Sequence, residues 1–332
     1  MTPKVSVIVC HHTGKLVLDA IETIRASKLV NVELILLTDD KDIIVHGVDR
    51  LIWSTQLPAA KRNIGVKFAS SKYLAFFDDD VQVNSNTISE MLKVLTQEGV
   101  GMVFGKSLNM EHRRRFDEAG GFLTSTGFIW ARAESGVEDI GQFNTVEPIF
   151  AGKSATCMVT REAFWRAGGF DDSFGILGEE SDLAWRVWLK GYKVMWCPKS
   201  VTYHAFNTKY KPVENFYTNE RIYLNGCRNY LHMLLKNAPV RMLLVALPAQ
   251  LFAWLLAAVG HMLVGRHRAS LLILQGIGAF FARSPSILWQ RKEVRSDICG
   301  QEQDILKQIM RNPSPSYYLK RLRSYIVRGT HG

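Results

Sequence analysis

The first hundred residues alternate between short apolar runs and amphipathic stretches, and this alternation restricts the fold more than any other feature of the sequence. The apolar runs have the length of buried strands, and the stretches between them place apolar residues at helical spacing. Strands that alternate with helices predict an α/β fold with a doubly wound, mostly parallel sheet. The expected strands are 5–10, 33–37 and 73–77, and the expected helices are 16–24, 58–68 and 88–95.

Acidic residues follow two of these strands. Asp39 comes directly after the second strand, and Asp78, Asp79 and Asp80 end the third. Ligands of doubly wound sheets bind beyond the carboxyl ends of the strands, which is where both groups of acids fall. Asp78 and Asp80 point the same way if the strand geometry persists, so they can share a divalent cation that bridges a diphosphate. An acidic turn without a chemical role is the alternative interpretation.

A second group of acids opens a later helix. Residues 175–192 contain an apolar helix face that ends at Gly191, which places Glu179 and Glu180 in the first turn. The helix dipole favours carboxylates there. A base that takes a proton from a substrate hydroxyl is a carboxylate or a histidine within hydrogen-bond reach, so these acids are candidates. Stabilisation of the helix start is the alternative.

Three further groups of polar residues are candidates for binding the same ligand. His204 follows an apolar segment after the acidic helix, where it either completes the coordination of a cation or is simply a satisfied polar residue. Asp39 can accept a hydrogen bond from a nucleotide base or a ribose hydroxyl. Lys61 and Arg62 can face a diphosphate, although a solvated charged surface explains them equally well in isolation.

Taken in order, these segments resemble glycosyltransferase family 2, and in particular bacterial rhamnosyltransferase-like enzymes of cell-surface glycan synthesis. The resemblance covers roughly residues 4–230 and is specific in combination. It implies the GT-A fold, Mg²⁺ or Mn²⁺, a UDP-, dTDP- or GDP-linked sugar donor and inverting transfer of a hexosyl group. The matching segments are VSVIVCHH, TDD, KRNIG, FFDDD, EAGGFLTSTGF, VEDIGQF, AGKSATCMVTREAFWRAGGFDDSFG, GEESDLAWR and YH.

By this resemblance, Glu180 falls where the family's catalytic base usually lies. The family pair more often reads Glu-Asp, and the change to Glu-Glu leaves open which of Glu179, Glu180 and Asp182 takes the proton. A pair of histidines, His11 and His12, replaces a common Pro-Thr, so the base of the donor stays open. The implied nucleotide-sugar-binding residues are His11, Asp39, Lys61, Arg62, Asp78 and Asp79, and the implied metal ligands are Asp78, Asp80 and His204.

The charge is unevenly distributed. From residue 205 onward there are 18 Lys and Arg against 6 Asp and Glu, a balance of +12, whereas the whole chain has +10. Residues 242–264 carry no formal charge and are long enough to cross a membrane, although Pro248, Gln250 and His261 interrupt them. A weaker apolar run follows at 269–281. We therefore expect a catalytic domain at 1–225 and a helical, basic and apolar, membrane-associating region at 226–332.

Basic residues flank the uncharged run on both sides, at Arg241 and at 266–268. A single span would place one of these groups outside, against the positive-inside tendency. We expect a peripheral or re-entrant arrangement on the inner leaflet, with one or two spans as alternatives, and the amphipathic segment 318–328 fits this interface. A buried helical subdomain or a dimer contact is the competing explanation.

Five scattered cysteines without metal-ligand spacing indicate neither a disulfide framework nor a zinc site, so a reduced, cytoplasmic location is expected. The long uncharged run argues against nucleic acid as a partner. A basic, membrane-adjacent tail suggests a lipid-linked glycan acceptor, as in the biosynthesis of polysaccharides of the cell wall. The competing hypothesis is a catalytically silent sugar-nucleotide-binding or scaffold protein of the same fold.

Overall fold

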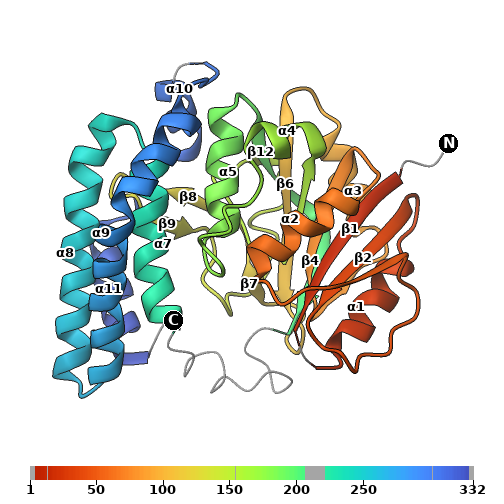
Figure 1. Cartoon of the computed structure of the whole chain (residues 1–332), viewed down its shortest axis with the longest axis horizontal. Helices are drawn as coiled ribbons and strands as arrows, with labels where there is room; N and C mark the ends of the chain where they lie inside the picture. Colours follow the sequence, from red (N-terminus) through yellow and green to blue (C-terminus); the bar gives the residue numbers. More distant parts are fainter. Residues whose placement is uncertain (1–3, 13, 154, 206–220, 301, 329–332) are drawn as a thin grey trace. The chain divides into compact units, whose positions relative to one another are not determined.

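A computed structural model describes the chain except for residues 1–3, 13, 154, 206–220, 301 and 329–332 (Figure 1). The chain divides into two compact units. The first unit comprises residues 1–121 and 131–210, and the second comprises 122–130 and 211–332. The functional division expected between residues 225 and 226 stays a prediction.

The first unit contains a ten-stranded sheet with the main order β10-β12-β6-β11-β4-β1-β2-β3 among the described residues. β5 pairs with β12, and β7 pairs with β6. A separate two-stranded sheet of β8 and β9 belongs mostly to the second unit. The strands are β1 Lys4–His11, β2 Asn31–Thr38, β3 Arg50–Trp53, β4 Tyr73–Asp78, β5 Val81–Val83, β6 Val100–Asn109, β7 Phe116–Glu118, β8 Gly121–Leu123, β9 Ile129–Ala131, β10 Glu147–Pro148, β11 Thr156–Thr160 and β12 Lys193–His204.

Strands β3, β2, β1 and β4 are parallel, and β12 is parallel to β6. β11 is antiparallel to both of its neighbours, β4 and β6. The predicted α/β fold with a mostly parallel sheet is therefore confirmed. The strand expected third is β4, because the short edge strand β3 precedes it.

Helices cover both faces of the sheet. Apolar residues of α1 and α3 pack on one face of β1, β2 and β4 in a single buried cluster. On the other face α2 approaches so closely that a Cβ on Gly65 would lie 2.6 Å from a methyl group of Ile8, which explains the glycine. Parallel strands covered on both faces have to be continuously apolar, as the sequence is. The helices of this unit are α1 Leu16–Arg25, α2 Pro58–Phe68, α3 Thr87–Leu95, α4 Arg161–Arg166 and α5 Glu179–Leu189.

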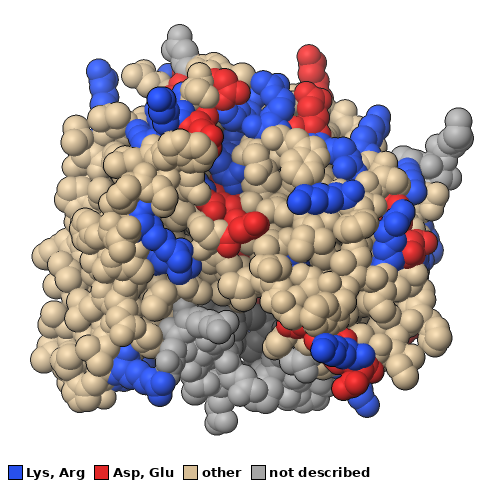
Figure 2. All heavy atoms as spheres, in the orientation of Figure 1, with Lys and Arg blue, Asp and Glu red and all other residues tan. Residues whose placement is uncertain are grey.

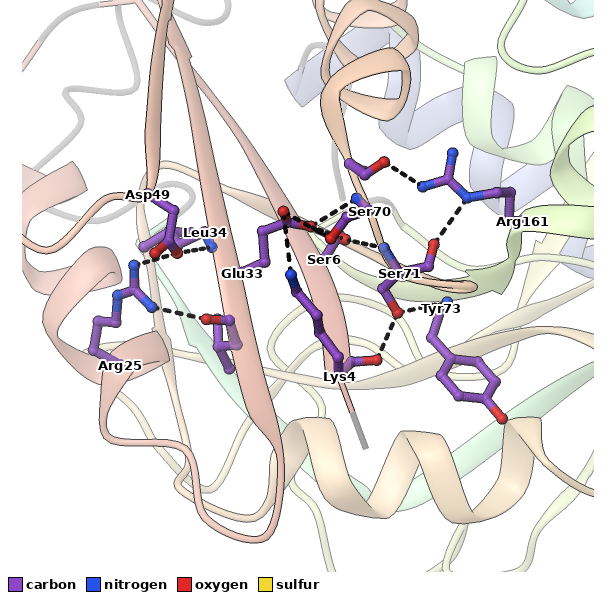
Figure 3. A network of polar contacts seen from close by, with 12 residues as sticks. Lys4, Ser6, Arg25, Glu33, Leu34, Asp49, Ser70, Ser71, Tyr73 and Arg161 are labelled. Atoms are coloured by element: carbon purple, nitrogen blue, oxygen red, sulfur yellow. Dashed lines mark hydrogen bonds and ion pairs between the residues drawn. The ribbon is translucent and has the colours of Figure 1, made fainter. Parts of the chain in front are cut away.

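A buried carboxylate stabilises the end of the sheet where β1 and β2 begin (Figure 3). Glu33 accepts hydrogen bonds from the hydroxyl of Ser6 at 2.5 Å and from the backbone of Ser70 at 2.8 Å. Burial raises the pKa of Glu33, but these hydrogen bonds and the nearby ammonium of Lys4 outweigh burial, and the net pKa is lowered. The carboxylate thus fastens the connection from α2 to β4 onto the sheet.

The second unit is helical apart from residues 122–130. α8 and α9 are both long and apolar enough to cross a membrane by length and composition, which agrees with the two apolar runs seen in the sequence. α9 packs tightly on α7, since a Cβ on Gly276 would lie 2.7 Å from the carbonyl oxygen of Leu224. The helices are α7 Arg221–Asn237, α8 Val240–Leu263, α9 His267–Arg295, α10 Glu302–Ile309 and α11 Pro315–Arg328.

One face of α8 remains exposed over the whole helix. Leu244, Phe252 and Leu263 are 71%, 64% and 81% exposed, and their spacing places them on one side. Figure 2 shows that the surface around α8, at the left of the view, is largely uncharged, with Lys and Arg side chains toward its two ends. Exposed apolar side chains in this number mark an interaction surface of the second unit.

Candidate active site

The predicted metal ligands meet where β4 turns into β5. Asp78 ends β4, and Asp80 lies in the turn that leads into β5. β12 runs antiparallel to β5 and pairs His204 with Val81. The Nε2 atom of His204 therefore lies 3.1 Å from an Asp80 oxygen and 3.9 Å from an Asp78 oxygen.

These three side chains fit a divalent cation. One ligand atom from each of Asp78, Asp80 and His204 lies within 4.8 Å of the others. Carboxylate oxygens with an imidazole nitrogen suit Mg²⁺ or Mn²⁺. Burial alone lowers the pKa of His204, but the carboxylates of Asp80 and Asp117 outweigh it and raise the pKa to about 10. The surroundings of the ring therefore favour positive charge, as a cation site requires.

Asp79 points away from this group, as the strand geometry predicted. Its carboxylate lies 2.8 Å from Nδ1 of His11, at the end of β1. At the end of β2, Asp39 contacts the exposed ring of His12 at 2.8 Å and the ammonium of Lys61 at 3.3 Å. The ends of three adjacent parallel strands thus bring the expected nucleotide-binding residues together.

Lys61 has two contacts within this group. Besides its ion pair with Asp39, its ammonium donates to the backbone carbonyl of His11 at 2.8 Å. Burial raises the pKa of Asp39, but the hydrogen bonds from His12 and Lys61 outweigh it, so the net pKa is lowered and the carboxylate is ionised at neutral pH. Asp39 can therefore accept a hydrogen bond from a base or a ribose.

Arg62 connects the strand-end acids to the acids of helix α5. Its buried guanidinium donates to Glu179 at 2.7 Å and to Asp78 at 3.1 Å. Burial opposes the charge, but these two carboxylates raise the pKa of Arg62 above its usual value. The metal-ligand candidates and the base candidates therefore belong to one cluster, although they are about a hundred residues apart in the sequence.

The three acids of α5 have different surroundings. Glu179 is buried and paired with Arg62. Asp182 is inaccessible and accepts two hydrogen bonds from Arg186, at 2.7 and 3.0 Å. Glu180 is half-buried, and among the described residues it has no ion-pair partner. Burial, and then the neighbouring charge of Glu179, raise its pKa well above the usual value.

Two further acids lie at this site that were not among the predicted site residues, although Glu118 opens the matching segment EAGGFLTSTGF. Asp117, on β7, accepts from Nδ1 of His204 at 2.9 Å and from the ammonium of Lys153 at 3.0 Å. Glu118 is held by the backbone N–H of Gly120 at 2.6 Å, and burial raises its pKa to about 7. Neither acid follows a long apolar strand, which was the signal that identified the others.

A family model described as Glycosyltransferase like family 2 matches residues 28–246. The chain belongs to this family. Among curated proteins of Drosophila melanogaster, it is similar to putative polypeptide N-acetylgalactosaminyltransferase 13, with 29% identity over 167 residues. It is also similar to N-acetylgalactosaminyltransferase 6, with 25% identity over 190 residues. These alignments cover 48% and 52% of this chain but only 28% of either relative.

Two solved structures share this fold. GalNAc-T7, crystallised with UDP, GalNAc and Mn²⁺, aligns with a TM-score of 0.51 at 14% identity, over 71% of this chain and 48% of its own. S. aureus TarS 1–349 aligns with a TM-score of 0.50 at 13% identity, over 88% and 90%. This likeness confirms the fold predicted from the sequence.

Proposed function

We propose that the protein transfers a hexosyl group from a nucleotide-diphospho-sugar to an acceptor hydroxyl, with inversion at the anomeric carbon. The observation that carries the proposal is the pairing of Arg62 with both Asp78 and Glu179, which joins the strand-end acids to helix α5. Asp78, Asp80 and His204 would hold Mg²⁺ or Mn²⁺, and the bound cation would offset the charge of the donor's diphosphate.

Glu180 is the best base among the three acids of α5. Arg62 binds one oxygen of Glu179, whose other oxygen is buried, and Arg186 binds the fully buried Asp182. Glu180 is only half-buried, so it is the acid most accessible to a substrate hydroxyl. Glu180 has the raised pKa that suits a general base at neutral pH. It takes the hydroxyl proton as the acceptor oxygen bonds to the anomeric carbon and the bond from that carbon to the diphosphate breaks.

The residues at the ends of β1, β2 and β4 bind the nucleotide of the sugar donor and orient it. As the family resemblance implies, Asp39 would accept a hydrogen bond from the base, and Asp78 would accept one from the ribose. Lys61 holds Asp39 ionised and fixes its position. The similarity to N-acetylgalactosaminyltransferases makes UDP-GalNAc the first donor to test, before other UDP-, dTDP- and GDP-linked sugars.

Release of nucleoside diphosphate from this donor panel, with Mn²⁺, Mg²⁺ or EDTA, tests the assignment. We expect Glu180→Gln to lower turnover by about 10²–10⁴-fold and to leave donor binding in place. Asp80→Asn should lower turnover and weaken Mn²⁺ binding. Full activity of either folded variant overturns the proposed mechanism, and donor binding without turnover across the panel supports the silent binding protein instead.

We also propose that the second unit binds the cytoplasmic face of a membrane and that the acceptor is a lipid-linked glycan. The exposed apolar face of α8, with Arg241 before it and Arg266 and Arg268 after it, supports a bilayer rather than a soluble partner. Sedimentation with anionic and neutral vesicles tests this. Leu244→Gln with Phe252→Gln should reduce binding, whereas Leu18→Gln with Leu51→Gln, exposed in the first unit, should not. Equal binding by both pairs contradicts the proposal.

A further inference from the structure

We propose that Asp117 is a positioning residue that holds His204 with its Nε2 atom directed at the metal site. This inference rests on the metal site of the proposed function, but it assigns a role to a residue outside the ligand set. Asp117 lies 2.9 Å from Nδ1 of His204, and Nε2 of the same ring faces Asp80 at 3.1 Å.

The backbone explains how Asp117 reaches the ring. In the ladder between β6 and β7, Ser107 pairs with Glu118 and Leu108 pairs with Phe116, so Asp117 is the extra residue of a β-bulge. A bulge redirects a side chain that a regular ladder would place elsewhere. The hydroxyl of Ser107 donates to the same Asp117 oxygen at 3.2 Å, which fixes the carboxylate against β6.

The chemistry of histidine gives this contact a consequence. A neutral imidazole carries its proton on one nitrogen and can bind a metal only through the other. A carboxylate that accepts from Nδ1–H keeps the proton there, so Nε2 presents its lone pair, and it also raises the basicity of the ligand. Asp117 is 4% exposed, so water does not compete for this hydrogen bond.

Lys153 completes the arrangement. Its ammonium contacts the second carboxylate oxygen of Asp117 at 3.0 Å, while 38% of the lysine side chain is exposed. The carboxylate of Asp117 is therefore held from both sides, by Lys153 on one oxygen and by His204 on the other. We assign Lys153 a supporting role, because it stabilises the carboxylate that orients the ligand.

The dissociation constant of Mn²⁺, measured on the full chain by electron paramagnetic resonance, tests the inference without reference to catalysis. Asp117→Asn should weaken Mn²⁺ binding by about 10–100-fold. Because the ligand set is intact, an excess of Mn²⁺ should restore full occupancy. Asp139→Asn is the matched control, since it alters another largely buried Asp–Lys ion pair of the first unit, with Lys106 at 2.5 Å. It should leave Mn²⁺ affinity unchanged.

His204→Ala and Lys153→Met separate the possible failures. If His204→Ala binds Mn²⁺ like the unaltered protein, the metal site of the proposed function is wrong, and this inference fails with it. If His204→Ala weakens binding and Asp117→Asn does not, only the positioning role is wrong. Lys153→Met keeps the Asp117–His204 contact and should weaken Mn²⁺ binding less than Asp117→Asn does. If Asp117→Asn does not fold, Lys153→Met is the variant that tests the inference. Unchanged affinity in Lys153→Met would then overturn the inference.

Discussion

Asp182 and Glu180 lie two residues apart at the start of α5, yet the structure predicts opposite consequences for replacing them. Asp182 is fully buried and accepts two hydrogen bonds from Arg186, whose guanidinium also donates to the carbonyl of Gly169 at 2.6 Å. Glu180 is half-buried and has no ion-pair partner among the described residues. We expect Asp182→Asn to destabilise the fold and Glu180→Gln to remove activity.

The magnitude for Asp182→Asn follows from burial. Both side chains of the pair are at most 4% exposed, so the substitution leaves the charge of Arg186 without its partner in a site that water does not reach. Removing one partner of a buried ion pair costs about 3–5 kcal/mol. The asparagine still accepts one hydrogen bond, so we expect about 3 kcal/mol. For a domain of this size each kcal/mol lowers Tm by about 2–4 °C, which gives a decrease of about 6–12 °C.

Two measurements on the same preparations check this pair. Thermal unfolding followed by circular dichroism gives Tm, and nucleotide release at a temperature well below Tm gives turnover. Glu180→Gln should keep Tm within a few degrees and lose about 10²–10⁴-fold in turnover. Asp182→Asn should have a lower Tm but keep most of its turnover at temperatures where it is folded. An Asp182→Asn variant that unfolds like the unaltered protein but is inactive would refute the reasoning and make Asp182 the base.

Three other predictions follow from single contacts. Glu179→Gln removes a charge that raises the pKa of Glu180, and it leaves Arg62 free to lower that pKa further. The acid limb of the pH profile of kcat/KM should therefore move to lower pH. An acid limb at the same pH as in the unaltered protein would contradict this prediction. Glu33→Gln should cost about 1–3 kcal/mol at neutral pH in urea unfolding. Because the pKa of Glu33 is lowered in the folded protein, the stability difference between the unaltered protein and Glu33→Gln should shrink as the pH falls through this lowered pKa. A difference that does not change with pH would show that the ionised carboxylate does not stabilise the fold. Gly276→Ala should destabilise the second unit by about 1–3 kcal/mol, measured by unfolding in detergent. Gly278→Ala in the same helix is the control: the added methyl group meets no atom within 4 Å, so the substitution should be neutral or stabilising.

The strand-end acids could be predicted because their positions depend on local patterns. A buried strand is recognisable as an apolar run, and its carboxyl end is the next polar residue, so Asp39 and Asp78 could be placed without knowing the rest of the chain. His204 could be placed for the same reason, at the end of β12. The short edge strand β3 escaped prediction because four residues with an exposed first position give too little pattern.

Asp117 and the partners of Arg62 could not be predicted, because both depend on contacts between distant segments. Asp117 reaches His204 only through a bulge between β6 and β7, and nothing in the local sequence marks a bulge. Arg62 was expected to face a diphosphate, and that role stays a prediction. Its pairing with Glu179, 117 residues away, follows from the packing of α2 beside the start of α5.

The charges around the site favour joint binding of a cation and an anionic donor. Among the described residues of the site, carboxylates outnumber the permanent cations. Burial, and then the charges of Glu179 and Asp78, keep the pKa of Glu180 high. A divalent cation alone would lower that pKa and weaken the base, whereas a cation bound with a diphosphate brings little net charge. If Glu180 is the base, as proposed, a cation bound alone would weaken it, whereas a cation bound together with the donor would leave its strength nearly unchanged. Among the described residues, the acids of the site are Asp39, Asp78, Asp79, Asp80, Asp117, Glu118, Glu179 and Glu180, and the permanent cations are Lys61, Arg62 and Lys153.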